Sequence, residues 1–359
     1  MRAITSLCFK ILLMMMLLQG LISTAVAENK VVVIPLVSKK IIPCPTLTDI
    51  LVEAGESIQD AINALPAEGG TVMLAAGLHE LAAGIHINRS HVKIVGEPGT
   101  IVRLKDHVNQ PVFLVGTDVQ TPDINNDLIS DITISNLEID GNQANQDSET
   151  DPNRSWIRNN GIDIRMIDGL RVTDVNVHDN RSGGIVASWK CNNISMSNIQ
   201  CHDNYFDGIA LYDSENIMIS DFSANNNDHG AGISLDNALK DVVFCNGIIR
   251  DNYDVGIFAR YSTNIIFRNM LVSGNGNHGA YLSHNFDGGN YATDRGVTNF
   301  LFTGCSFQGN AGYGIFISDD EPTYDHDNAV TSSLFNDNSD GCINTTDSTV
   351  LSQDAVICN

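Results

Sequence analysis

The chain has 359 residues, of which 43% are apolar, 20 are basic and 43 are acidic, so its formal net charge is −23. This charge argues against nucleic acid and anionic membrane surfaces as partners. It also repels polyanions unless local basic side chains or a bound cation reverse the field.

The first 27 residues are predicted to be a signal peptide. Arg2 and Lys10 give it a positive start, residues 11–18 are apolar, and residues 25–27 have the small side chains of a cleavage site. The apolar run is too short to cross a bilayer, and no later segment reads as a span. We therefore expect a secreted or periplasmic protein without a membrane span.

An N-terminal extension, residues 28–56, precedes the main domain, residues 57–359. At the start of this domain, residues 57–65 are predicted to form a short amphipathic helix with Ser57 as its N-cap. Pro66 and two glycines end the helix, and a strand follows at residues 71–74. A helix here can cover the apolar end of a solenoid, which such folds require.

A glycine followed by an aliphatic residue returns every 23 or 24 residues along most of the chain. These glycines are Gly161, Gly184, Gly208, Gly232, Gly256 and Gly279, with Gly314 after an insertion. Each unit holds three short apolar runs separated by Asp, Asn, Ser and Gly, and no unit can bury its own apolar face alone. The sequence predicts an all-β fold, a right-handed parallel β-helix in which three strands per coil build three sheets.

Two positional columns follow from this repeat. Residues one and three positions beyond each glycine are predicted to point inward as aliphatic stacks. Four positions before the glycine, a polar column is predicted to form an internal side-chain ladder at a turn. Its members are Asn180, Asn204, Asp228, Asn252, Asn275 and Asn310.

Three excursions break the period, at residues 142–160, 284–296 and 321–327. Insertions of this kind lie in loops at one edge and are candidates for the walls of a groove. Acidic loops at residues 147–151 and 319–321 leave calcium open as a ligand, although no recognised calcium spacing occurs. We assign no metal ligands.

The cysteines are predicted to be structural. Export permits disulfides, and Cys342 with Cys358 is the predicted C-terminal pair. Cys201, Cys245 and Cys305 are expected to be small buried apolar residues.

The capping helix and the repeat, from Ser57 to about Asn338, resemble secreted right-handed β-helix proteins of the pectin-lyase-like group. Residues 137–142 (LEIDGN) and 260–269 (RYSTNIIFRN) are similar to parts of mannuronan (alginate) C5-epimerases. Those enzymes carry a catalytic Tyr-Gly-Phe-Asp-Pro-His segment, whereas the matching coil here, residues 183–188, reads GGIVAS. The signatures of polygalacturonases and pectate lyases are also missing. The resemblance implies the fold and a carbohydrate partner, and it transfers no catalytic residue.

Candidate site residues come from the outward positions of the repeat. Four positions beyond the glycine, Tyr212, Asp236 and Arg260 fall on successive coils, which rise by about 4.8 Å each. Together with His229 they are the predicted catalytic groups, because removal of a uronate C5 proton needs a neutralised carboxylate, a base and an acid. The predicted substrate-binding residues are Lys190, Trp189, Asp213, Tyr261, His284 and Arg165.

The leading hypothesis is a secreted protein that acts on an extracellular, uronate-containing polysaccharide as a lyase or C5-epimerase. One alternative is a non-catalytic glycan-binding or cell-surface β-helix. Another is a glycoside hydrolase with paired aspartates, such as Asp213 or Asp207 with Asp236. We expect a monomer.

Overall fold

The computed structural model describes residues 48–283, 296–318, 325–345 and 349–359. The chain divides into two compact units, Met1–Pro45 and Thr46–Asn359, and every described residue belongs to the second. The predicted signal peptide lies outside the described residues, as does most of the predicted extension. Among the described residues, no helix is long and apolar enough to cross a membrane.

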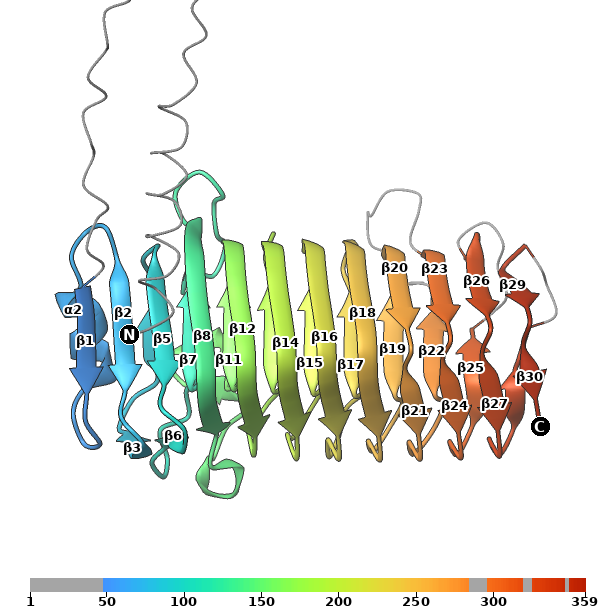
Figure 1. Cartoon of the computed structure of the whole chain (residues 1–359), viewed down its shortest axis with the longest axis horizontal. Coiled ribbons are helices and arrows are strands. Elements are labelled where there is room, and N and C mark those ends of the chain that lie inside the picture. The colour runs from blue at the N-terminus through green and yellow to red at the C-terminus, as the bar shows by residue number, and fades with distance from the viewer. Residues whose placement is uncertain (1–47, 284–295, 319–324, 346–348) are drawn as a thin grey trace, which may run out of the picture. The chain divides into compact units, whose positions relative to one another are not determined.

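One sheet of the second unit takes a single short strand from each successive coil (Figure 1). Its ten parallel strands are β4 (Ile85–Ile87), β7 (Phe113–Gly116), β11 (Ile162–Arg165), β13 (Ile185–Ser188), β15 (Ile209–Tyr212), β17 (Ile233–Asp236), β19 (Ile257–Arg260), β22 (Ala280–Ser283), β25 (Tyr313–Ile317) and β28 (Gly341–Ile343). We call it the groove sheet. Its register pairs Ile162 with Ile185 and Ile185 with Ile209. The predicted inward column is therefore confirmed.

The other two faces belong to one larger parallel sheet. Strands on one line are β1 (Thr48–Val52), β2 (Gly70–Leu74), β5 (Val92–Gly96), β8 (Ile129–Asp140), β12 (Ile167–His178), β14 (Asn192–His202), β16 (Glu215–Asn225), β18 (Leu239–Arg250), β20 (Ser262–Arg268), β23 (Val297–Thr303), β26 (Asn328–Thr331) and β29 (Leu351–Asp354). The shorter strands on the second line are β3 (Gly77–Leu81), β6 (Thr100–Leu104), β21 (Leu271–Ser273), β24 (Ser306–Gln308), β27 (Leu334–Asn336) and β30 (Ile357–Cys358).

The long strands β8 to β18 bend in the middle, which turns one sheet into two faces. At each bend an Asn or Asp has left-handed backbone with φ between 52° and 57°, a conformation these residues tolerate well. The bend residues are Asn136, Asp174, Asn198, Asp221 and Asn246. With the groove sheet this makes three faces per coil, so the predicted right-handed parallel β-helix is confirmed.

A polar ladder runs beside the apolar core, as predicted, with one member reassigned. Asn204 Nδ2 donates to Asn227 Oδ1 (3.0 Å), and Asn227 Nδ2 donates to Asn252 Oδ1 (2.7 Å). The predicted member Asp228 is wrong. Four residues separate Asn227 from Gly232, whereas three separate Asn204 from Gly208, so counting back from the glycine misses by one.

A helix covers the first coil of the described solenoid, and a disulfide links two strands at the other end. At the first coil, helix α2 (Ile58–Ala64) buries Ile58 and Ile62, and the Oγ of Ser57 accepts the N–H of Asp60 at 3.1 Å, as predicted for an N-cap. At the other end, a disulfide joins Cys342 to Cys358, confirming the predicted pair. Cys201 and Cys305 are buried as expected, but Cys245 is only half-buried because it points outward from β18.

Candidate functional site

A groove of about 720 Å³ lies on the outer side of the groove sheet. It is lined by Trp156, Arg158, Asn160, Asp163, Arg165, Val186, Ser188, Trp189, Tyr212, Asp213, Asn237, Ala238 and Tyr261. A smaller hollow of about 160 Å³ adjoins it and shares Arg158, Asn160, Val186 and Tyr212 with it. The residues therefore come from five successive coils and from the excursion at residues 142–160.

That excursion forms a wall of the groove, as its break in the repeat predicted. It contains a 3₁₀ turn, η1 (Gln143–Asn145), and two antiparallel strands, β9 (Thr150–Asp151) and β10 (Arg154–Arg158). Arg154 pins the hairpin, since its guanidinium contacts buried Asp151 at 2.8 Å and Asp118 at 2.9 Å. Trp156 Nε1 donates to the carbonyl oxygen of Asp118 at 2.9 Å. The wall is thus tied to the loop after β7.

Two large residues at the edge of the groove, Trp189 and Tyr261, have backbone conformations that bulky residues rarely adopt. At the corner that follows each strand of the groove sheet, Trp189 has φ 63° and Tyr261 has φ 45°. Left-handed backbone is unusual for bulky residues and concentrates at functional sites. Trp189 is 37% exposed, so part of its ring faces the groove.

Asp163, on β11, is a carboxyl group of the groove that sequence reasoning missed. It is 3% exposed, and burial raises its pKa to about 7, although Arg165 and Arg158 oppose this rise. A signal was present, because Asp163 is the acidic member of an outward column that otherwise reads Val186, Ala210 and Ser234 on the next coils.

A second carboxyl group, Asp207, sits in the adjoining hollow. Burial raises its pKa to about 6, against the N–H of Ala231, which donates to it at 2.8 Å. The hydroxyl of Tyr212 donates to Asp207 Oδ2 at 3.4 Å and to Ser234 Oγ at 3.3 Å. Burial and the nearby carboxylate raise the pKa of Tyr212, which therefore keeps its proton.

The structure places Tyr212, Asp236 and Arg260 on successive strands, as predicted, with Tyr212 directly opposite Asp236 in the register. Asp236 is 5% exposed and binds the guanidinium of Arg260 through Nε (2.9 Å) and Nη2 (2.5 Å). Neither Asp236 nor Arg260 lines the groove that holds Tyr212. As placed, the two form an ion pair beside the groove.

The other predicted residues divide between the groove and its surroundings. Trp189, Asp213, Tyr261 and Arg165 line the groove. Arg165 is 4% exposed, however, and donates to the carbonyl oxygens of Thr117 (3.1 Å) and Val119 (2.8 Å), so it holds the wall in place. The centre of the Trp189 ring lies 5.6 Å from the guanidinium carbon of Arg165.

Two further predicted residues, Lys190 and His229, do not line the groove. Lys190 binds Asp213 at 2.5 Å and lines a separate hollow. His229 lies on a turn, stacked between Tyr205 (4.2 Å) and Tyr253 (5.6 Å). His229 falls on a turn because the corner between Asn227 and Gly232 has one residue more than its neighbour, which is also why Asp228 is not part of the ladder. His284 lies outside the described residues.

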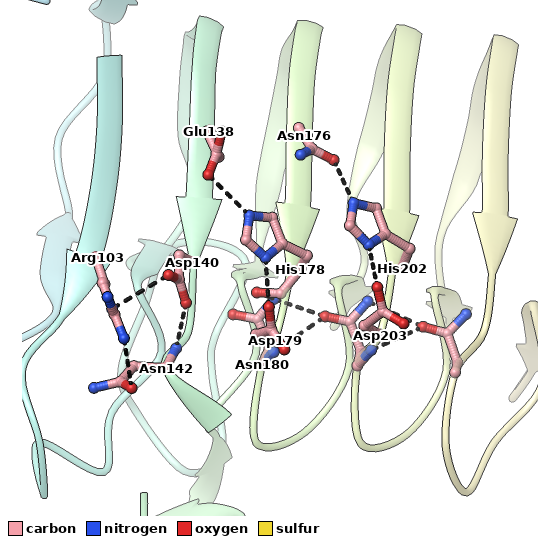
Figure 2. A network of polar contacts seen from close by, with 12 residues as sticks. Arg103, Glu138, Asp140, Asn142, Asn176, His178, Asp179, Asn180, His202 and Asp203 are labelled. Carbon is pink, nitrogen blue, oxygen red and sulfur yellow. Dashed lines mark hydrogen bonds and ion pairs between the residues drawn. The ribbon is translucent and has the colours of Figure 1, made fainter. Parts of the chain in front are cut away.

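A second concentration of polar groups follows the ends of β8, β12 and β14, on turns beside the asparagine ladder (Figure 2). His178 Nδ1 lies 2.7 Å from Asp179 Oδ2, and its Nε2 lies 3.1 Å from Glu138 Oε1. The ring of His202 stacks on that of His178 at 5.1 Å and is held in the same way by Asp203. Burial lowers the pKa of His178, but the hydrogen bonds to Asp179 and Glu138 outweigh it, and the pKa is raised.

Within the described ranges, Asp140, His178 and Asp179 form the one group of three possible metal ligands whose donor atoms lie within 4.8 Å of one another. Their donor atoms already have partners. Asp140 pairs with Arg103 at 3.2 Å and accepts the N–H of Asn142 at 2.7 Å, while both ring nitrogens of His178 face carboxylates. The acidic loop at residues 147–151 is similarly occupied, since Asp147 contacts His107 and Asp151 contacts Arg154.

A family model described as "Periplasmic copper-binding protein (NosD)" matches residues 135–352. The chain belongs to the NosD family. A periplasmic family bears out the predicted secreted or periplasmic location. Among curated proteins, a search finds no significant match.

Solved structures similar to this NosD-family chain share its fold. The surface protein and adhesin PfbA of Streptococcus pneumoniae is 16% identical, with 87% of this chain and 89% of that chain covered and a TM-score of 0.61. Polygalacturonase from Erwinia carotovora ssp. carotovora is 12% identical, with 92% and 97% covered and a TM-score of 0.58. The A-module of mannuronan C-5 epimerase AlgE4 from Azotobacter vinelandii is 19% identical, with 79% and 89% covered and a TM-score of 0.49. The likeness to PfbA and to the polygalacturonase shows a shared fold, as the sequence resemblance implied.

The described residues of this NosD-family chain do not fit copper. Copper prefers thiolate, thioether and imidazole ligands. The Asp140–His178–Asp179 group offers one imidazole whose two nitrogens are engaged, and a guanidinium lies beside it. The buried Cys191 and Cys305 have thiol pKa values raised to about 11 by burial, which disfavours the thiolate.

Proposed function

We propose that the groove binds an extracellular, uronate-containing polysaccharide, and that the protein acts on it as a lyase or C5-epimerase. The observation that carries this proposal is that Trp156, Trp189 and Tyr261 line the same groove as Arg158. Aromatic faces pack against the C–H faces of sugars, and a guanidinium binds a carboxylate through paired hydrogen bonds.

Arg158 also reconciles an acidic protein with an acidic ligand. The formal net charge of −23 repels a polyanion at long range, whereas the groove lining carries two arginines, Arg158 and Arg165, against two aspartates, Asp163 and Asp213. Arg158 is exposed, and its guanidinium lies 5.1 Å from the ring of Phe206 beside the smaller hollow and 3.4 Å from Glu149, an exposed pair that a uronate carboxylate would have to displace or share. We propose that this guanidinium neutralises the uronate carboxylate, the condition for removing the C5 proton.

Asp207 and Tyr212 are the groups we propose for the proton removal itself. Asp207, with its pKa near 6, is ionised at neutral pH and accepts a hydrogen bond from the hydroxyl of Tyr212. Asp207 therefore acts as the base, and Tyr212 relays the proton to it. Both line the small hollow beside Arg158. The predicted catalytic pair of Asp236 and Arg260 is replaced in this proposal, because Asp236 is neutralised by its arginine.

The test is a binding and product assay on the mature chain with polymannuronate, polyguluronate and polygalacturonate, with and without calcium. We expect binding that Arg158→Ala weakens, together with unsaturated uronates by absorbance or C5 inversion by proton NMR. Asp207→Asn should retain binding and lose product, whereas Asp174→Asn, an exposed aspartate at a strand bend, should change neither. Absence of binding to every polymer contradicts the proposal.

A non-catalytic glycan-binding protein is the second candidate. The engaged state of Tyr212 and Asp236 favours it, since both groups already have partners inside the protein. Binding that survives with no product from any polymer would select this candidate.

A further inference from the structure

Asp163 is a buried carboxyl group that the proposed reaction has not yet used. It lies in the middle of β11, with Leu114 of β7 opposite it on one side and Val186 of β13 on the other. Both neighbours are apolar, and the excursion covers the strand, so the side chain is 3% exposed. It nevertheless lines the groove, so a ligand in the groove can reach it.

Two arginines face Asp163. Arg165 lies two residues further along its own strand, and Arg158 approaches from β10 with both its charge and its backbone N–H. Leu114 and Val186, on the adjacent strands, carry no charge. Desolvation exceeds the attraction of these two guanidinium groups, and the pKa of Asp163 rises to about 7. Near neutral pH the group therefore exists in both protonation states.

The second acid of the groove region stands on the other side of Val186. Asp207 lines the small hollow, Asp163 lines the large groove, and Arg158, Asn160, Val186 and Tyr212 belong to both. Along the sheet, Asp163 is opposite Val186, and Val186 is opposite Ala210, three residues after Asp207. A sugar whose carboxylate is held by Arg158 thus lies near two titratable groups that belong to different coils.

We propose that Asp163 is a second catalytic residue, the acid that delivers a proton to the sugar bound at Arg158. The inference rests on the proposed function. It assigns to this buried carboxyl group the delivery of a proton to the sugar, because Asp207 and Tyr212 only remove one. Proton exchange at C5 requires one group that removes the proton and a second that returns one.

The step balances without any co-reactant. The C5–H bond breaks and its proton passes to the Asp207–Tyr212 pair. In epimerisation the Asp163 proton then forms a new C5–H bond on the opposite face. In elimination the C4–O4 bond breaks, a C4=C5 double bond forms, and the Asp163 proton goes to O4. Exchange with water returns both carboxyl groups to their starting states.

The experiment compares wild type, Asp163→Asn and the control Asp174→Asn on the same three polyuronates. Binding is measured by calorimetry, product by proton NMR and absorbance, and folding by thermal unfolding. We expect Asp163→Asn to keep its binding within about threefold and to lose at least about 100-fold in turnover. The wild-type rate should fall as the pH rises above about 7, since the acid loses its proton, and residual activity of Asp163→Asn should lack that decline.

Several outcomes separate this inference from the proposed function. Normal turnover by a folded Asp163→Asn, or an unchanged alkaline limb, overturns the role of Asp163 while leaving the binding proposal intact. Binding without turnover by wild type also overturns it. Loss of binding to every polymer in wild type overturns both. If Asp163→Asn unfolds, Asp163→Glu serves instead, and a rate profile identical to wild type in that variant counts against the inference.

Discussion

The groove and the histidine turns of Figure 2 use the same residue types to different ends. On the turns, each carboxylate meets a partner of opposite charge or a donor, as Asp179 meets His178 and Asp140 meets Arg103. Asp163, buried in the groove, and Asp207, half-buried in the adjoining hollow, lose more to desolvation than their partners return, and their pKa values rise to about 7 and about 6. Satisfied polar groups lock a fold, whereas poorly compensated carboxyl groups are poised for proton transfer. Four substitutions test that contrast.

The largest effect is expected on the satisfied side, in the asparagine ladder. Asn252 is 2% exposed; its Oδ1 accepts from Asn227, and its Nδ2 donates to Asn275 Oδ1 and to the carbonyl of Ala224. Asn252→Ala leaves buried donors and acceptors unpaired, and we expect a loss of about 3 kcal/mol in the free energy of unfolding, measured with urea. Asn277→Ala, at an exposed position, should cost less than about 0.5 kcal/mol. Equal losses in both variants would contradict the special role of the ladder.

In the groove, a substitution is expected to raise the free energy of unfolding instead of lowering it. The folded protein holds the proton of Asp163 up to about pH 7, whereas the unfolded chain releases it near pH 4, so stability falls as the pH rises through that window. Asp163→Asn should therefore stabilise the protein at pH 8 by about 2 kcal/mol and change little at pH 4. Thermal unfolding at the two pH values measures this. A variant that is destabilised equally at both would mean that the carboxylate is compensated after all.

A smaller effect is expected for ligand binding. Trp156 is 36% exposed on the wall of the groove, and its truncation removes a sugar-stacking face. Trp156→Ala should weaken polyuronate affinity by about tenfold, or about 1.4 kcal/mol. Tyr253→Ala removes a ring that is 70% exposed and lies outside the groove, and it should have no effect in the same calorimetric titration. Equal weakening by both would move the binding surface away from the groove.

The smallest effect belongs to His178. Its raised pKa means that protonation stabilises the folded protein below about pH 6.5, and this contribution disappears as the pH rises through the folded value. His178→Gln should thus cost about 1 kcal/mol at pH 5.5 and less at pH 9, as measured by urea unfolding. A pH-independent cost would show that the ring contributes by packing on His202 alone.

The fold could be predicted from the sequence because the repeat pattern lies within single coils. The Gly-Ile spacing and the Ser57 cap each act within one coil, and each is where the pattern placed it. The site was harder to predict. Tyr212 and Asp236 were placed side by side correctly, and the same one-coil spacing also puts Asp236 next to Arg260, with which it forms an ion pair beside the groove.

Asp163 escaped notice because its environment is assembled from distant segments. Leu114 is 49 residues before it and Val186 is 23 residues after it, and the excursion covers all three. Burial of a charge is a property of that assembly. The spacing of charges along the chain could show where the acid lies on its coil, but the amount of water excluded from it depends on β10.

The turn between Asn227 and Gly232 has one residue more than its neighbour, yet both flanking residues keep their places in the stack. A corner of this kind accommodates one inserted residue without disturbing the coils on either side. The hairpin at residues 142–160 is a larger instance of the same tolerance. Such an architecture can acquire new surfaces one corner at a time, which lets related chains diverge in what they recognise while the scaffold stays the same.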